Sequence, residues 1–354
     1  SQAKLMAKKR AAGRDIEIPL PKDVTRRIEC LQNPVLFLRT YFPETFSQPF
    51  TGDRQAMLDG IVQAASYGGD QAIAGPRGEG KTRIAMYGAL YLMVRQLSSF
   101  PIVIAKSSNK AANELRTIRE RLQQSELLRE DFPEICVPFN AVGNWASRAK
   151  MQTVNGKYTN IEIMGTHCIF PSIDRKDLPY NWPENVEPAC NGQIISCMGI
   201  DGPIRGTNYR DKRPTLAILD DIEDQESAKS SSLIEKNESI IEKDIGGLGG
   251  NGQRVSRIML CTIQNKRCIA FRYSDPEQKP SWRGKRYRKM LTPPSRMDLI
   301  EQYLELRAAR KNDDPDAREA FVFYKENQEA IEADCEVSNK WSYDQRLHTD
   351  GDPI

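Results

Sequence analysis

Eight consecutive residues decide the fold of this chain: Gly75, Pro76, Arg77, Gly78, Glu79, Gly80, Lys81 and Thr82. They fit the pattern G-x-x-x-x-G-K-S/T and lie between a short apolar run, residues 71–74, and a stretch that predicts a helix from residue 81 onward. In a loop of this kind, backbone N–H groups surround phosphate oxygens, the lysine reaches the β- and γ-phosphates, and the threonine hydroxyl ligates Mg²⁺. The order of strand, loop and helix disfavours a chance glycine-rich turn. The stretch therefore predicts a binding site for ATP and Mg²⁺.

A second motif supplies carboxylates for the same site. The apolar run 215–219 is long enough for a buried parallel strand, and Asp220, Asp221 and Glu223 follow it. Ligands of open α/β sheets gather at the carboxyl ends of the strands. We expect Asp220 to hold the metal and Asp221 to orient the attacking water, with Glu223 as the competing base. The alternative is an acidic turn whose carboxylates cap the next helix.

Bulk composition fits one large α/β domain with an appendage. The chain has 354 residues, of which 39% are hydrophobic and 28% are charged. No apolar run approaches the length of a membrane span, and we expect the protein in the cytoplasm with no membrane partner. Eight cysteines without a C-x-x-C pair, and only two histidines, argue against a zinc site and a disulfide scaffold.

The net charge of +3 makes a weak overall case for nucleic acid, but one strip is strongly basic. Residues 279–296 contain no acid, and the candidate DNA-binding side chains among them are Lys285, Arg286, Arg288 and Lys289. Equally, residues 284–291 could form a late strand with solvated basic residues on one face.

Periodicity predicts an alternation of helices and strands. Helices are expected over residues 53–67, 82–97, 110–130 and 225–244, and strands over 101–105, 161–164, 167–170, 193–198 and 255–263. Successive strand–helix units indicate a parallel, doubly wound sheet. Gln55, near the start of the first of these helices, is a candidate for reading an adenine edge or simply a polar surface residue.

The expected boundaries give three parts. Residues 1–22 are polar and basic and predict a flexible arm, residues 23–294 form the phosphate-loop ATPase domain, and residues 295–354 form a helical linker region.

The residues before the acidic motif resemble a known family. The run Gly199 to Tyr209, followed by Arg213 to Asp224, is similar to the large terminase subunits of tailed bacteriophages, the ATPases that pump DNA into proheads. The resemblance covers roughly residues 30 to 345. It implies a mainly parallel α/β sheet flanked by helices, of the RecA-like additional-strand, catalytic-glutamate (ASCE) type. It also implies a coupling motif at Thr262 and Gln264, and a phosphate-loop arginine at Arg77.

Further expectations follow from this resemblance. The chain would hydrolyse ATP to translocate double-stranded DNA, working with a portal protein and a small terminase subunit in a homo-oligomeric ring. Asp221 stands where the family more often has glutamate, which leaves the base open. The chain also stops where a nuclease domain would begin, so no nuclease activity is expected. The alternatives are a superfamily-two helicase-like ATPase and a nucleotide switch that does not hydrolyse.

An additional arginine is expected at the γ-phosphate, because charge builds up there during transfer. Arg77 can act within its own subunit, and Arg205 would act across a subunit interface. Gly202 and Gly206 bracket Arg205, which predicts an exposed loop. Arg210 is the rival, and a structural arginine is the alternative for Arg205.

Overall fold

The computed structural model describes residues 14–50, 52–143, 146–189, 191–250, 252–308 and 318–337. These described residues divide into two compact units: those within 1–47 and 56–286, and those within 48–55 and 287–354. Among the described residues, no helix has the length and apolar character needed to cross a bilayer. Seven cysteines are described, all are free, and six of them are buried.

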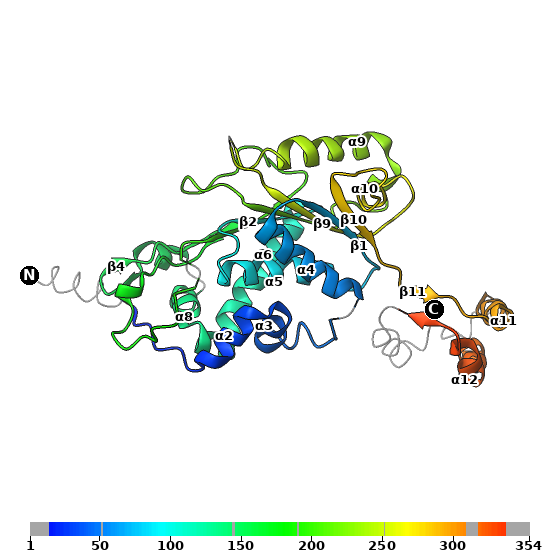
Figure 1. Ribbon diagram of the computed structural model, residues 1–354, viewed down its shortest axis with the longest axis horizontal. Helices are drawn as coiled ribbons and strands as arrows, with labels where there is room; N and C mark the ends of the chain where they lie inside the picture. The colour runs from blue at the N-terminus through cyan, green and yellow to red at the C-terminus, as the bar shows by residue number, and fades with distance from the viewer. Residues whose placement is uncertain are drawn as a thin grey trace, which may run out of the picture. The chain divides into compact units, whose positions relative to one another are not determined.

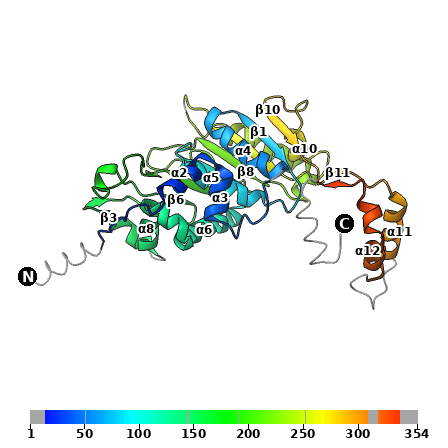
Figure 2. The same ribbon diagram turned by 60° about the horizontal axis from the view of Figure 1, so that its bottom comes forward.

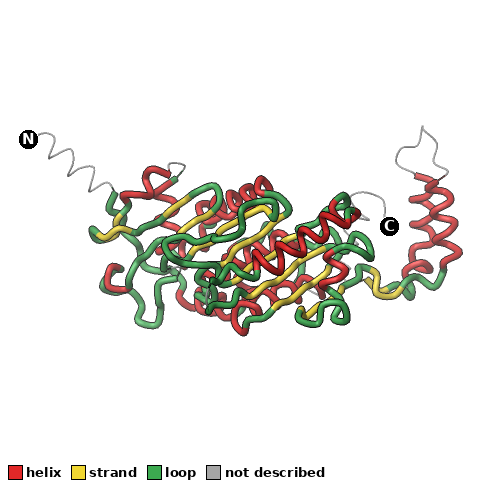
Figure 3. Tube along the Cα trace, turned by 90° about the horizontal axis from the view of Figure 1, so that it is seen from above, coloured by secondary structure: helices red, strands yellow, loops and turns green. Residues whose placement is uncertain are grey.

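The first unit is built on an eight-stranded sheet with the order β10-β1-β9-β8-β2-β7-β6-β5. Figure 3 shows the strands lying side by side. The strands are β1 (Asp70–Ala74), β2 (Pro101–Ala105), β5 (Glu162–Ile163), β6 (His167–Ile169), β7 (Ile194–Gly199), β8 (Leu216–Asp220), β9 (Ser256–Cys261) and β10 (Trp282–Arg286). Every pair from β10 to β7 is parallel, and β6 and β5 extend the sheet as an antiparallel hairpin.

The strand order defines the class of fold. β9 lies between β1, which leads into the phosphate loop, and β8, which carries the acidic motif. A strand inserted between these two is the additional strand expected from the sequence. The fold is thus a mainly parallel, RecA-like phosphate-loop fold of the additional-strand class, as predicted.

Helices cover both faces of the sheet (Figure 1). On one face lie α4 (Gly52–Tyr67), α5 (Lys81–Val94) and α6 (Ser108–Gln124), and on the other lie α9 (Ser231–Ser239) and α10 (Ile269–Tyr273). Alternate strand residues such as Ala72, Ile104, Leu219 and Met259 share a buried cluster with Ile234 and the π-helix Ile240–Ile245. Burial on both faces explains why these strands read as continuous apolar runs.

The remaining elements of this unit are short. They are α2 (Val24–Gln32), α3 (Pro34–Tyr41), α7 (Glu126–Asp131), α8 (Pro133–Val142), the two-stranded ribbon β3 (Thr153–Val154) with β4 (Lys157–Tyr158), and the 3-10 turns Ala146–Met151, Arg175–Asp177 and Ser227–Lys229. α2 is held by a buried ion pair in which Arg27 Nη2 lies 2.8 Å from Glu134 Oε1.

Two predicted helices are broken in the structure. Ser125 ends the helix expected over 110–130 and caps α7, because its hydroxyl accepts the N–H of Leu128 at 3.3 Å. The helix expected over 225–244 begins later because Asp224 and Ser227 bond to each other's backbone N–H, each at 2.9 Å. The chain resumes as α9 only after Ser230, which caps it, and then continues as the π-helix.

Part of the predicted N-terminal arm lies outside the described residues, and its described part is packed. Ile16 N–H donates to Thr153 O at 2.8 Å, Lys22 N–H donates to Glu130 O at 2.8 Å, and Ile18 is 2% exposed. Order therefore begins before residue 23, because Ile18 buries its side chain among apolar residues such as Val154 and Trp182.

The second unit is a helical pair closed by a small ribbon. α11 (Met297–Ala308) and α12 (Arg318–Glu332) lie side by side (Figure 2), and β11 (Met290–Thr292) pairs antiparallel with β12 (Glu336–Val337). The pair has its own core of Leu299, Tyr303, Ala320, Tyr324 and Ile331. The unit boundary falls after residue 286, eight residues before the predicted one.

Candidate nucleotide site

The phosphate loop joins β1 to α5 as the motif requires. Gly78 has φ +87° and Gly80 has φ +74°, conformations that favour glycine, and a Cβ placed on Gly80 would meet no atom within 4 Å. The Lys81 ammonium is turned back onto the loop, where it donates to Pro76 O at 2.7 Å. The loop therefore has open space beside Gly80 and a buried lysine positioned to reach a phosphate.

Asp220 brings the two motifs together. Its side chain is 1% exposed, and Oδ2 accepts the Thr82 hydroxyl at 2.7 Å and lies 3.2 Å from Lys110 Nζ. Oδ1 is buried and has no hydrogen-bond partner among the described residues. Burial raises the pKa of Asp220, while Lys110 and Thr82 oppose that shift. The predicted pair of metal ligands, Thr82 and Asp220, is thus in direct contact.

The hard oxygen donors of this pair suit Mg²⁺. Mg²⁺ in nucleotide sites is held by one or two protein oxygens together with phosphate oxygens and water. Across the part of the chain that the structure describes, no group of three or more His, Cys, Asp or Glu side chains forms a metal cage. Thr82 and Asp220 would therefore hold the ion jointly with a bound triphosphate, and the buried, unbonded Oδ1 of Asp220 fits this role.

Asp221 and Glu223 face different partners. Asp221 has φ +40°, an uncommon conformation for a non-glycine residue, and its Oδ2 lies 3.8 Å from Lys81 Nζ. Glu223 is 8% exposed, and its Oε2 accepts the N–H of Ala270 at 3.0 Å in α10. Burial raises the pKa of Glu223, and the backbone N–H groups of α10 oppose it. Asp221 therefore lies beside the phosphate-loop lysine, whereas Glu223 is bonded to α10.

Arg77 and the predicted coupling motif also meet. Arg77 Nη2 donates to Gln264 Oε1 at 2.8 Å, which connects the phosphate loop to the segment that follows β9. Thr262 directly follows β9 and precedes Gln264, and its hydroxyl is buried. Glu79, also in the loop, is buried. Gln55 lies in α4 but belongs to the second compact unit, so its adenine contact stays a prediction.

The candidate finger arginines have different surroundings. The Arg205 side chain is 75% exposed, and its Nε donates to Asp244 Oδ1 at 2.5 Å. Gly206 beside it has φ +74°. Arg210 instead donates to Asn160 O at 2.8 Å and to Glu162 Oε2 at 3.1 Å, next to the antiparallel edge of the sheet. Arg205 is therefore the more exposed of the two.

The basic strip falls across the boundary between the units. Lys285 is exposed on β10, which the structure places at the edge of the main sheet beside β1. Arg286 is engaged, since it donates to Phe271 O at 2.6 Å and Asp275 Oδ2 at 3.0 Å and lies over the Phe271 ring. Arg288, which is exposed, and Lys289 belong to the second unit. Their contact with DNA stays a prediction.

Sequence reasoning did not single out two lysines that follow β2. Lys110 faces Asp220, and Lys106 pairs with Asp224, where it holds the pKa of that carboxyl below its usual range. Both contacts exist because β2 pairs with β8, with Ala105 beside Asp220. The sequence shows that both lysines follow a predicted strand. It does not show which strand pairs with that strand, and so it does not show which carboxylates the lysines face.

The fold and the paired motifs thus define a phosphate-loop protein of the additional-strand class. No protein-family model matches the chain, and no curated protein matches it. Among solved structures, it is similar to the large terminase ATPase domain of Thermus phage P74-26. The point-mutant form shows 14% identity, 75% coverage of this chain, 95% coverage of that domain and a TM-score of 0.38. The second P74-26 structure shows 15% identity, coverages of 80% and 98%, and a TM-score of 0.38.

The large terminase of bacteriophage HK97 is similar at 16% identity and a TM-score of 0.37, over 80% of this chain and 49% of that one. All three are large terminases, the family that the motifs resemble. The likeness is distant at these TM-scores, so the residues of the site must support any function assigned to the chain.

Lys110 offers a test of the metal site. Replacing Lys110 by methionine removes a positive charge that faces Asp220, so a divalent cation should bind the nucleotide-free chain more tightly. Two unit charges near a protein surface interact by about 4 kcal/mol at roughly 4 Å, and partial exposure of Lys110 reduces this, so we expect a gain of about tenfold. Titration with Mn²⁺, followed by the electron paramagnetic resonance of the free ion, measures it.

Lys106→Met is the matched control, because that ammonium pairs with Asp224 rather than Asp220. It should leave Mn²⁺ affinity unchanged. Unaltered or weaker Mn²⁺ binding by Lys110→Met would show that Asp220 is not the metal carboxylate.

Proposed function

We propose that this chain is an ATPase that drives double-stranded viral DNA into a prohead, the motor portion of a large terminase. The observation that carries the ATPase proposal is the contact between Thr82 of the phosphate loop and the buried Asp220 carboxylate, beside Lys81 and Asp221. These residue types in this arrangement are the ones that phosphoryl transfer to water requires.

Each side chain has a distinct role in the proposed hydrolysis. Lys81 leaves Pro76 O and binds the γ-phosphate, while Thr82 and Asp220 hold Mg²⁺. The ion, when bound, neutralises charge on the β- and γ-phosphate oxygens. Asp221 accepts a hydrogen bond from the attacking water and orients it in line with the γ-phosphorus. Arg77 acts within the subunit, and Arg205 acts across a subunit interface.

Two observations support the motor part of the proposal. The motifs resemble large terminases, and Arg77 connects the phosphate loop to Gln264, the residue expected to couple hydrolysis to movement. We infer that the working form is a homo-oligomeric ring at the portal, in the cytoplasm of a bacterial host, together with a small terminase subunit.

Lys81→Ala should abolish hydrolysis and weaken triphosphate binding, because it removes the buried cation that the loop directs at the γ-phosphate. Phosphate release in steady state and titration with a fluorescent ATP analogue measure the two effects. Arg95→Ala, at an exposed position at the end of α5, is the control and should change neither. Near-normal turnover by Lys81→Ala would contradict the site assignment.

The base is tested by two charge-removing substitutions. Asp221→Asn should bind ATP with Mg²⁺ yet release no phosphate, because the amide cannot accept the water proton. Glu223→Gln should keep measurable turnover, since the Glu223 carboxylate accepts a hydrogen bond from the backbone of α10. The same phosphate-release assay distinguishes them, and the reverse pattern would give the role to Glu223.

Arg205→Ala should fold and bind ATP but lose on the order of 10³-fold in turnover within the assembled motor. Mixing it with Lys81→Ala subunits should restore some activity at interfaces where an intact Arg205 meets an intact phosphate loop. Asp244→Asn, which only releases Arg205 from its ion pair, should retain turnover. Normal hydrolysis by Arg205→Ala, or no recovery on subunit exchange, would exclude a trans-acting role.

A further inference from the structure

A cavity of about 520 Å³ lies between the segments that follow β8 and β9. We call it the loop cavity, and its lining residues are Gln225, Ala228, Lys229, Gln264, Asn265, Lys266 and Arg267. Both segments start at the carboxyl edge of the sheet, where the nucleotide site lies. The loop cavity is therefore a neighbour of that site and is built from different side chains, apart from Gln264.

The lining is positively charged and contains no aspartate or glutamate. Lys229, Lys266 and Arg267 are exposed, and none of them forms an ion pair within the described ranges of the chain. By contrast, Lys106 is paired with Asp224, which precedes Gln225 in the chain. Three unneutralised cations around one cavity favour an anion as its ligand.

The cavity is held in shape by Asn265. Its amide nitrogen donates to Ala228 O at 2.8 Å, which connects the segment after β9 to the segment after β8. Its amide oxygen accepts the N–H groups of Arg267 at 2.7 Å and Cys268 at 3.0 Å. The two walls are thus connected by Asn265, and each wall contributes cations to the lining of one cavity.

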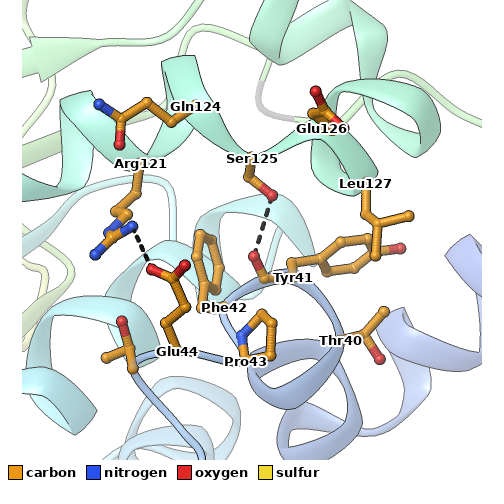
Figure 4. Close-up of a pocket in the computed structure, with 11 residues that line it drawn as sticks. Thr40, Tyr41, Phe42, Pro43, Glu44, Arg121, Gln124, Ser125, Glu126 and Leu127 are labelled. Atoms are coloured by element: carbon orange, nitrogen blue, oxygen red, sulfur yellow. Dashed lines mark hydrogen bonds and ion pairs between the residues drawn. The ribbon is translucent and has the colours of Figure 1, made fainter.

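Another cavity in the described residues lacks this character. It has a volume of about 370 Å³ and lies between the end of α3 and the junction of α6 and α7 (Figure 4). Arg121 is paired with Glu44 at 3.1 Å, and the Ser125 hydroxyl donates to Tyr41 O at 3.0 Å. Its cation is already neutralised, so it offers no comparable site for an anion.

We propose that the loop cavity binds a phosphate group of the backbone of duplex DNA. Lysine, arginine and amide side chains are the groups that contact DNA phosphates, and contacts of this kind position the duplex without reading its sequence. The proposal rests on the proposed function, because it assigns one DNA contact of the same motor.

The position of the cavity gives the contact a mechanical use. Gln264 both lines the cavity and accepts the hydrogen bond of Arg77 from the phosphate loop. When ATP draws Arg77 toward its phosphates, that bond breaks, and the adjoining Asn265 to Arg267 segment loses one of its supports. The grip of the cavity on a DNA phosphate thus depends on the state of the nucleotide.

The test compares the salt dependence of duplex DNA binding for the full chain and a triple variant, Lys229→Gln, Lys266→Gln and Arg267→Gln. Fluorescence anisotropy with a labelled duplex in the presence of Mg²⁺ and a non-hydrolysable ATP analogue gives the slope of log K against log salt. Each lost phosphate contact lowers its magnitude by roughly 0.9, so loss of the single phosphate held in the cavity predicts a fall of about 0.9. Analogue binding should remain unchanged.

Lys236→Gln is the matched control, because Lys236 is exposed on α9 and does not line the cavity. It should leave the slope as in the parent chain. A triple variant with the parent slope overturns the proposal, and so does a triple variant that loses only the binding of inorganic phosphate, which would make the cavity a site for the free ion. If the parent chain neither binds duplex DNA nor hydrolyses ATP, the proposed function itself fails.

Discussion

A buried carboxylate with too few partners is the constraint around which this site is organised. Asp220 ends a strand that is covered on both faces, and an ionised group at such a depth is unfavourable unless it is paired. Its present partners are the hydroxyl of Thr82 and the ammonium of Lys110. Both come from other segments of the chain, so the stability of this one carboxylate requires that three strand ends meet at one edge.

The same edge also connects the proposed nucleotide site to the segments that follow β8 and β9. β9 lies between the strand of the phosphate loop and the strand of Asp220, so it adjoins both halves of the site. Arg77 bonds to Gln264 just beyond β9, and Asn265 connects that segment to the one after β8. Two hydrogen bonds, joined by the peptide link between Gln264 and Asn265, thus connect the phosphate loop to an exposed basic cavity.

Local signals in the sequence were enough for the phosphate loop, the acidic strand end and most helices and strands. Glycines at fixed spacing and apolar runs are readable without knowledge of neighbours. The breaks at Ser125 and after Asp224 were missed because side-chain capping there overrides helical periodicity. Strand order was available only through the family resemblance. Lys110 faces Asp220 and Glu223 faces α10 because of tertiary packing, which no local sequence pattern encodes.

A structure of the chain with Mg²⁺ and a non-hydrolysable ATP analogue tests the account most directly. We expect the triphosphate inside the loop from Gly75 to Thr82, with Lys81 moved from Pro76 O to the γ-phosphate. The Thr82–Asp220 contact should be opened by the ion, and Lys110 should be displaced from Asp220. A nucleotide bound elsewhere, or a triphosphate in the loop with Lys81 still on Pro76 O and Asp220 still on Lys110, would contradict the assignment of these residues as a hydrolytic site.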